Sequence, residues 1–110
     1  MHLLQARILR RVASGAAICA LCREAVRPDD DVIITPDFLA DDTDPLWRFT
    51  DAVVHRPCFL LWDQRKTFVA RFNRVARQLV ADNGSYPHMT SEGDIVQRRG
   101  GRPSRRGPAA

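Results

Sequence analysis

Apolar side chains recur at helical spacing between residues 58 and 80, and this is the clearest helical signal in the chain. They fall at intervals of three, four and seven residues, which places them along one face of a helix. Asn83-Gly84 follows as a typical helix stop signal. The pattern predicts one long helix from Cys58 to Val80. Its expected apolar face consists of Phe59, Trp62, Val69, Phe72, Ala76 and Leu79, widened by Leu61, Phe68 and Val75.

A second amphipathic stretch lies at residues 1–17. Its apolar residues fall on one side of a helix and its arginines on another, so we expect an N-terminal helix that packs on the rest of the protein. The stretch bears arginine and no acid, as mitochondrial presequences do, and a cleavable targeting segment is therefore the alternative. The apolar residues are Leu3, Leu4, Ile8, Leu9 and Val12, and the arginines are Arg7, Arg10 and Arg11.

The residues between these helices have the character of short strands. Val32–Thr35 is rich in β-branched side chains, Leu46–Phe49 alternates apolar and polar ones, and Ala52–Val54 runs directly into His55. Pro57 suits the first turn of the helix that follows. The expected fold class is α+β: a small domain with a short β-hairpin, one long C-terminal helix and an N-terminal helix.

Two short motifs carry the candidate chemistry, Cys19–Cys22 (CALC) and His55–Cys58 (HRPC). Together they read C-x2-C-x32-H-x2-C and contain every cysteine of the sequence. A spacing of two residues lets a tight turn, or the first turn of a helix, direct both side chains at one ion. Three thiolates and one imidazole in tetrahedral geometry are a ligand set that structural zinc prefers. We therefore expect one structural Zn²⁺, held by Cys19, Cys22, His55 and Cys58.

Other interpretations of these residues stay open. The cysteines could be small core residues with His55 as a hydrogen-bonded neighbour. Cys19 and Cys22 could form a redox pair, but Cys58 and His55 would then need a separate explanation. His88 is not expected as a further ligand, because the four nearer groups close the site. The acids of residues 36–45 match no calcium-loop spacing and are expected to form a solvated loop: they are Asp37, Asp41, Asp42 and Asp44.

Charge is segregated along the chain. The net charge is +4, and the basic residues are 16 Arg and one Lys. Residues 98–110 contain five Arg and no acid, whereas the rest has 12 basic and 13 acidic residues. We expect this basic tail to be disordered, because it offers no apolar side chain for a core. The expected organisation is a helix at 1–17, a zinc-binding domain at 18–84, an irregular segment at 85–97 and the tail at 98–110.

The arginines make nucleic acid a candidate partner. A row on the predicted long helix could join the tail in contacting phosphates, with an affinity that falls steeply with salt. Gly101-Arg102-Pro103 is similar to the centre of an AT-hook. A solvated helix face and a solubilising tail are the plainer alternatives. The candidate nucleic-acid-binding residues are Arg71, Arg74, Arg77, Arg98, Arg99, Arg102, Arg105 and Arg106.

Composition also bears on location. No stretch approaches the ~20 apolar residues that a membrane span needs. Metal-spaced cysteines without an export signal are typical of a reducing compartment, so we expect a cytoplasmic protein. Abundant Arg, Ala and Asp suggest a GC-rich coding sequence and a bacterial source.

The order of a ligand knuckle, a two-strand insert and a ligand pair that opens a helix is the layout of a treble-clef zinc finger. The ligand pattern resembles that of the poly(ADP-ribose) polymerase-type fingers and, more loosely, the first half of a LIM domain. Trp47 and the H-x2-C-F run that ends at Phe59 belong to the match, which covers residues 19–62. The resemblance implies zinc ligation alone. The insert is acidic, the gap between the pairs is slightly longer, and the second zinc half of a LIM domain is absent.

The expected function is a non-enzymatic one. A zinc ion with four protein ligands has no open position for water or substrate. The sequence also lacks a P-loop, a G-x-S-x-G motif and a Gly-rich dinucleotide signature. We expect a small regulatory or adaptor protein that binds another protein through its acidic insert or its helices. The alternatives are a DNA- or RNA-binding zinc finger protein that uses the Arg-rich tail and helix, and a C-x-x-C redox protein.

Overall fold

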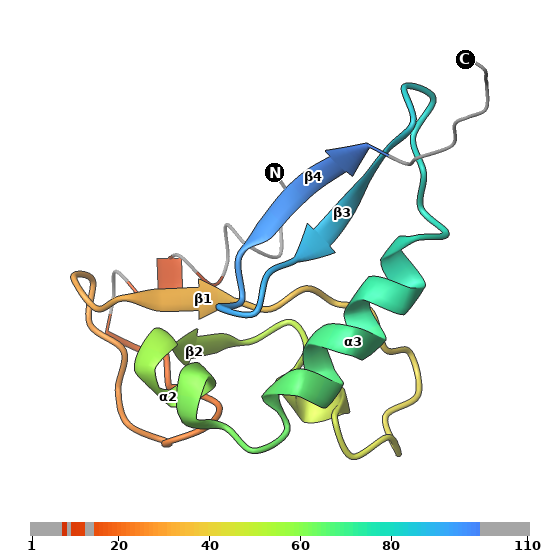
Figure 1. Cartoon of the computed structure of the whole chain (residues 1–110). Coiled ribbons are helices and arrows are strands. Elements are labelled where there is room, and N and C mark those ends of the chain that lie inside the picture. The colour runs from red at the N-terminus through yellow and green to blue at the C-terminus, as the bar shows by residue number, and fades with distance from the viewer. Residues whose placement is uncertain (1–7, 9, 13–14, 100–110) are drawn as a thin grey trace. The chain divides into compact units, whose positions relative to one another are not determined.

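The β-branched runs on either side of the acidic loop pair with each other. The computed structural model describes residues 8, 10–12 and 15–99. In it, β1 (Val32–Ile34) and β2 (Val53–His55) form a two-stranded antiparallel sheet (Figure 1). The register joins Val32 to His55 and Ile34 to Val53. The α+β class and both of these strands agree with the expectation, and His55 lies at the end of β2.

The loop between β1 and β2 is closed at its base by Thr35. Its hydroxyl is buried and donates a hydrogen bond to the carbonyl of Phe49 at 2.6 Å, while it accepts the N–H of Ala52 at 2.9 Å. Three of the loop's four acids are exposed and Asp44 is half-buried. The acidic stretch is thus a loop on the surface, as expected.

The segment Leu46–Phe49 is not the strand that its alternation predicts. It forms a 3-10 helix, η1 (Trp47–Phe49). The Asp44 carboxylate accepts the N–H of Leu46 at 3.0 Å, and the Asp44 carbonyl accepts that of Trp47 at 2.9 Å. At the other end, the Thr50 hydroxyl donates to the Trp47 carbonyl at 2.6 Å. Local bonds from short polar side chains therefore outweigh the alternating pattern.

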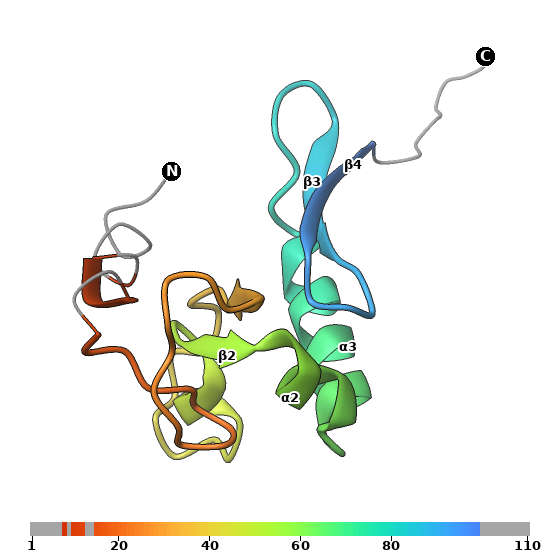
Figure 2. The ribbon, with the colours of Figure 1, turned by 90° about the vertical axis from the view of Figure 1, so that its left-hand side faces the viewer.

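The prediction of one long helix over residues 58–80 is wrong. The segment contains two helices, α2 (Arg56–Leu61) and α3 (Arg65–Ala76), and β2 runs directly into α2 (Figure 2). Pro57 lies in the first turn of α2, as expected. Trp62 ends α2 with an extended backbone, φ −71° and ψ 127°, and its ring packs 4.7 Å from that of Phe49. A tertiary contact that periodicity does not reveal thus accompanies the break.

The break changes which residues are buried. In α3 the buried side chains are Phe68, Phe72 and Ala76, which follow each other at four-residue intervals. Leu61 is 88% exposed and Leu79, beyond the end of α3, is 59% exposed. The predicted apolar face is therefore only partly correct, since a new helix phase begins after Trp62.

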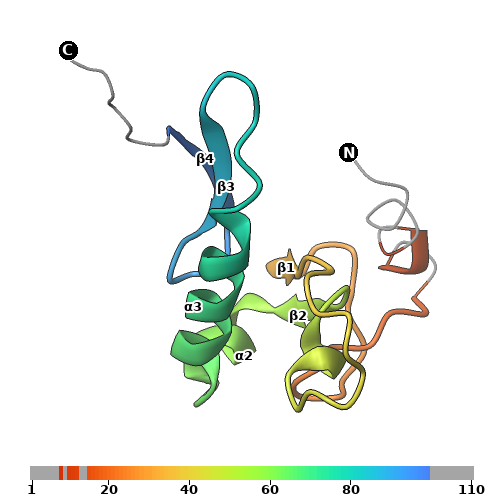
Figure 3. The same cartoon turned by 90° about the vertical axis from the view of Figure 1, so that its right-hand side faces the viewer.

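Residues 85–97 are not irregular, because two strands occupy most of this segment. β3 (Ser85–Met89) and β4 (Ile95–Arg99) form an antiparallel hairpin (Figure 3). Gly93 has a φ of 94° in the tight turn, where a left-handed conformation favours glycine. Arg98 and Arg99, predicted as the start of the tail, lie in β4. The remainder of that predicted tail, 100–110, lies outside the described residues.

The chain divides into two compact units, Met1–Arg65 and Lys66–Ala110. The predicted zinc-binding domain of residues 18–84 spans this division. Among the described residues of the first unit, the largest fully buried side chains are Cys19, Val26, Val54 and Phe59. Most of the predicted N-terminal helix lies outside the described residues, but Ile8 and Arg10–Val12 are helical, and Ile8 and Val12 are buried. No helix in the described part of the chain is long and apolar enough to cross a membrane.

Candidate metal centre

Cys19 and Cys22 lie on a tight turn that an isolated bridge between Ile18 and Ala25 closes. The N–H of Cys19 donates to the Glu24 carbonyl at 2.9 Å, and the N–H of Arg23 donates to the Cys19 carbonyl at 3.0 Å. Arg23 has a φ of 68°, a left-handed conformation that lets the chain reverse within few residues. The turn is therefore shaped so that two cysteines three positions apart share one side.

His55 and Cys58 lie where β2 becomes α2. His55 is both the last residue of β2 and the N-cap of α2, and Cys58 belongs to the first turn of this helix. The N–H of Ala20, between the first two cysteines, donates to the carbonyl of Val53 in β2 at 3.0 Å. This bond attaches the cysteine turn to the strand that leads to the second pair of residues.

The structure brings the four predicted residues together. One ligand atom from each of Cys19, Cys22, His55 and Cys58 lies within 4.8 Å of all the others. Around a tetrahedral zinc with bonds of about 2.3 Å to sulfur, the ligand atoms are roughly 3.8 Å apart. None of the three cysteines is part of a disulfide bond. The group is therefore compatible with a Cys3His zinc site in both its donor set and its dimensions.

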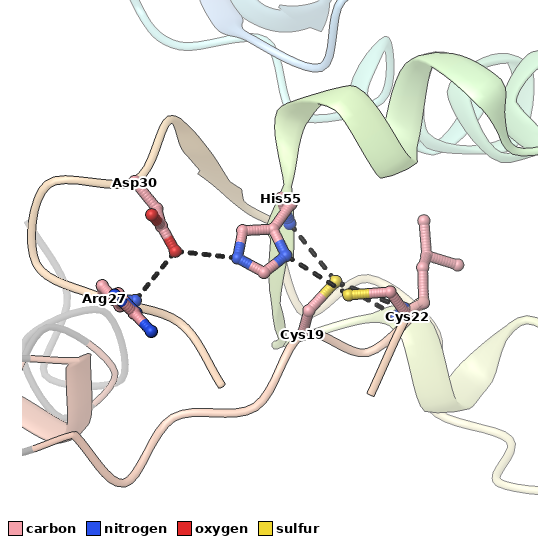
Figure 4. A network of polar contacts seen from close by, with 6 residues as sticks. Cys19, Cys22, Arg27, Asp30 and His55 are labelled. Carbon is pink, nitrogen blue, oxygen red and sulfur yellow. Dashed lines mark hydrogen bonds and ion pairs between the residues drawn. The ribbon is translucent and has the colours of Figure 1, made fainter. Parts of the chain in front are cut away.

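The His55 ring is oriented by a carboxylate outside the motif (Figure 4). Its Nδ1 lies 3.4 Å from the Cys22 sulfur, and its Nε2 lies 2.9 Å from Oδ2 of Asp30. Asp30 in turn accepts the backbone N–H of Arg27 at 2.9 Å. In many metal sites a carboxylate holds the second nitrogen of a histidine in this way, which fixes the ring and its tautomer. Nδ1 is thus the nitrogen available to a metal ion.

Asp30 is the functional residue that sequence reasoning missed. It belongs to the run Asp29–Asp31, which directly precedes β1. The signal that could have found it is strand register. Because Val32 pairs with His55, an acid two residues before Val32 falls close to the imidazole.

The Cys19 sulfur is held by backbone donors. It is fully buried and accepts N–H groups from His55 at 3.3 Å, Leu21 at 3.4 Å and Cys22 at 3.5 Å. Burial by itself would raise the pKa of this thiol, but the hydrogen bonds from Cys22, His55 and Leu21 together lower it to about 6. At neutral pH Cys19 is therefore a thiolate, the form that binds metals.

Cys58 and His55 retain their protons at neutral pH. Burial raises the pKa of Cys58 to about 12, helped by its hydrogen bond to Cys22 and by the negative charge of Cys19. Burial opposes the charged form of His55, but hydrogen bonds to Cys22 and Asp30 outweigh it and raise the pKa of the imidazole to about 9. The negative charge of the Cys19 thiolate thus favours protonation of the groups around it. A divalent cation can replace these protons.

The predicted nucleic-acid-binding residues are in the second unit. Arg74 is exposed on α3 and Arg77 is exposed just beyond its end, whereas Arg71 is half-buried and has interactions of its own. Arg98 and Arg99 are exposed on β4. Arg102, Arg105 and Arg106 lie outside the described residues. The predicted row is therefore not a uniform solvated face.

His88 is on β3 and is not part of the metal group within the described residues. Burial, together with the positive charges of Arg98 and Arg77, lowers its pKa. This shift indicates that Arg77 and Arg98 both lie close to His88. Positive charge from these two arginines thus lies near His88, the fourth residue of β3.

Comparison with protein families, with curated proteins and with solved structures finds no match for this chain. The assignment of the site therefore depends on its geometry and on the chemistry of its donors.

Proposed function

We propose that Cys19, Cys22, His55 and Cys58 hold one structural Zn²⁺ ion in a non-enzymatic interaction module. The observation that carries the proposal is the convergence of four donor atoms within 4.8 Å, one of them an imidazole nitrogen whose ring is oriented by Asp30. Soft thiolates with an imidazole select zinc over harder ions. The low pKa of Cys19 supplies one thiolate before the ion arrives.

The order of the elements supports a treble-clef interpretation. A cysteine turn at residues 18–25 is followed by the β1–β2 hairpin, and the second ligand pair lies at the start of α2. The 3-10 helix η1 and the short length of α2 are departures from the expected layout. The resemblance to poly(ADP-ribose) polymerase-type fingers and LIM domains is thus one of ligand arrangement, and it supports zinc binding without naming a partner.

A structural role for the ion follows from its proposed coordination. Four protein ligands complete a tetrahedral shell, so no position remains for a water or substrate. We infer that the protein acts by binding, as a small regulatory or adaptor protein. Exposed apolar side chains in the first unit, Leu61 at 88% and Trp47 at 42%, support a protein partner.

Binding to DNA or RNA is the second candidate, and the distribution of charge favours it. Residues 66–110 contain nine basic and three acidic residues, against eight and ten in residues 1–65. Retention on DNA that falls steeply with salt, and that is lost when residues 100–110 are removed, would support this function. A truncation after Arg99 leaves β4 intact, because this strand ends at Arg99.

A pair of variants tests the zinc assignment. Cys58→Ser removes a ligand, so it should lose the metal and most of the helicity, because binding free energy at a structural site is largely folding free energy. His88→Ala is the matched control, since His88 lies outside the metal group. It should keep both properties. Metal content and far-ultraviolet circular dichroism measure the outcome, and a Cys58→Ser protein that binds zinc as tightly as the wild type contradicts the proposal.

A further inference from the structure

The β3–β4 hairpin of the second unit has two outer edges, and the backbone register identifies the groups on each. At the turn, the N–H of Thr90 donates to the carbonyl of Asp94 at 2.8 Å, so these two residues form a hydrogen-bonded pair. Hydrogen-bonded and non-hydrogen-bonded pairs alternate along an antiparallel ladder. The pair Met89 and Ile95 is therefore non-hydrogen-bonded, and so is every second pair beyond it. In a non-hydrogen-bonded pair, the backbone N–H and C=O groups of both residues point away from the partner strand. The residues in this position are Ser85, Pro87 and Met89 on β3 and Ile95, Gln97 and Arg99 on β4.

The outer edge of β3 is closed by the chain itself. The side-chain amide of Asn73, on α3, accepts the N–H of Met89 at 2.7 Å and donates to its carbonyl at 3.1 Å. Pro87 has no N–H to offer. The N–H of Ser85 donates to the Asn83 side chain at 3.0 Å, and its carbonyl accepts the N–H of Ala81 at 2.8 Å. No free donor is left on this edge for another strand.

The outer edge of β4 is open. All five residues of the strand are exposed. Within the described part of the chain, no backbone bond outside the hairpin reaches Ile95, Gln97 or Arg99. Three residues at alternate positions thus present both N–H and C=O groups outward, which is the template that an added strand requires. The two outer edges of the hairpin therefore differ, because the backbone groups on the edge of β3 are bonded within the chain and those on the edge of β4 are available to another strand.

We propose that the outer edge of β4 binds an extended acidic segment of a partner protein as an additional strand. The proposal rests on the protein-binding function proposed above and names its surface. β4 carries Arg98 and Arg99 and no acid. An acidic strand would place carboxylates opposite these arginines, and Ile95 and Val96, 40% and 41% exposed, supply apolar contacts.

Charge argues against a second copy of this chain as the occupant. Edge-to-edge pairing of two β4 strands would bring two Arg98-Arg99 pairs into one sheet. Charged side chains on an edge are a common protection against such self-pairing. The same arginines attract an acidic strand. A nucleic acid would also satisfy the arginines, but it would not use the outward N–H groups of the edge.

Fluorescence anisotropy with a defined probe tests the proposal. The probe is a fluorescein-labelled peptide of about eight residues that alternates glutamate and valine. A second peptide has the same sequence and is N-methylated at every backbone nitrogen, so that neither of its edges can donate a hydrogen bond. Gln97→Pro removes an outward N–H that the hairpin does not use, and Gln97→Ala is the control that keeps it. We expect the wild type and Gln97→Ala to bind equally, Gln97→Pro to bind at least about tenfold more weakly, and the N-methylated peptide to bind to none of them.

Four results would overturn the proposal. The first is that the wild type binds the N-methylated peptide as tightly as the unmodified one, and the second is that it binds neither peptide. The third is that it binds a single-stranded oligonucleotide of equal charge but does not bind the peptide. The fourth is that the wild type forms a dimer in sedimentation and that Gln97→Pro dissociates this dimer. The N-methylated peptide decides the case even if Gln97→Pro disturbs the hairpin. Zinc content measured on the same samples separates the two proposals, because a zinc-loaded protein that ignores the peptide contradicts only this one.

Discussion

Asp30 contacts a residue of the candidate metal centre although it lies outside the ligand motif. Its carboxylate holds Nε2 of His55 at 2.9 Å and is itself fixed by the N–H of Arg27. The N–H of Arg27 and the hydrogen bond to His55 keep the pKa of Asp30 below its usual range. The acid is therefore ionised wherever the site can bind a metal, and it directs Nδ1 toward the thiols.

Asp30→Ala should lower zinc affinity by about 10–100-fold, because the imidazole loses the partner that sets its orientation and its basicity. Asp30→Asn keeps an acceptor oxygen and should therefore lower the zinc affinity by a smaller factor. Asp31→Ala is the matched control, since Asp31 pairs with Arg56 at 3.0 Å on the surface and does not contact the site. Competition with a chromophoric chelator gives the affinities. Equal affinities for Asp30→Ala and Asp31→Ala would show that the carboxylate has no role in metal binding.

Zinc binding should strengthen as pH rises. In the metal-free site His55 and Cys58 have pKa values of about 9 and about 12, so at neutral pH both hold protons that zinc must displace. Fewer protons compete at higher pH, and affinity therefore increases from acid toward pH 9. We expect zinc binding at pH 7 to release at least the two protons held by His55 and Cys58, measured by calorimetry in buffers of different ionisation enthalpy. Binding that releases no protons would contradict this ionisation state.

The sequence alone was sufficient to predict that the four donor residues share one site. It was not sufficient to predict that Asp30 contacts His55. Cysteine and histidine at two-residue spacing identify themselves through their own chemistry. Asp30 acts through the register of β1 against β2, which joins positions far apart in the chain. No local pattern contains that information.

The elements differ in how far local pattern determines them. β1 and β2 follow their β-branched residues, and Pro57 begins α2 as expected. The break between α2 and α3 coincides with the packing of Trp62 on Phe49, which helical periodicity does not encode. The β3–β4 hairpin was missed because its strands contain a proline and adjacent arginines, and its position depends on Asn73 of α3.

Asn73→Ala should destabilise the hairpin. It leaves the N–H and the carbonyl of Met89 without their partner, and Met89 is buried. An unsatisfied buried backbone group costs roughly 1–3 kcal/mol. Hydrogen exchange at β3 should accelerate accordingly, and the urea midpoint should fall. Gln78→Ala, at an exposed position just beyond α3, serves as the control. Unchanged protection of Met89 in Asn73→Ala would contradict the anchoring role of the amide.

The molecule as a whole combines two units of opposite charge. Residues 1–65 have a net charge of −2 from their side chains, and the proposed zinc ion bound to three thiolates would add about −1 more. Residues 66–110 have a net charge of +6. The sequence predicted the fold class and the concentration of basic residues toward the C-terminus. It did not predict a division near Arg65, because that boundary depends on contacts between distant segments.

The small size of the chain is a reason to expect that a metal ion at the proposed site would matter for the whole molecule. A chain of 110 residues that divides into two units has little room for a core in each of them. Small units commonly depend on a metal ion as a cross-link. The proposed zinc would connect the cysteine turn, the end of β2 and the start of α2, which are the elements that define the first unit.

The most direct test is zinc stoichiometry on protein purified under reducing conditions, with helicity followed while a chelator is added. The account predicts one zinc per chain and loss of structure when it is removed, because the ion and the fold of the first unit depend on each other. A protein without zinc that keeps an unchanged fold would contradict the account. That result would instead favour Cys19 and Cys22 as a redox pair.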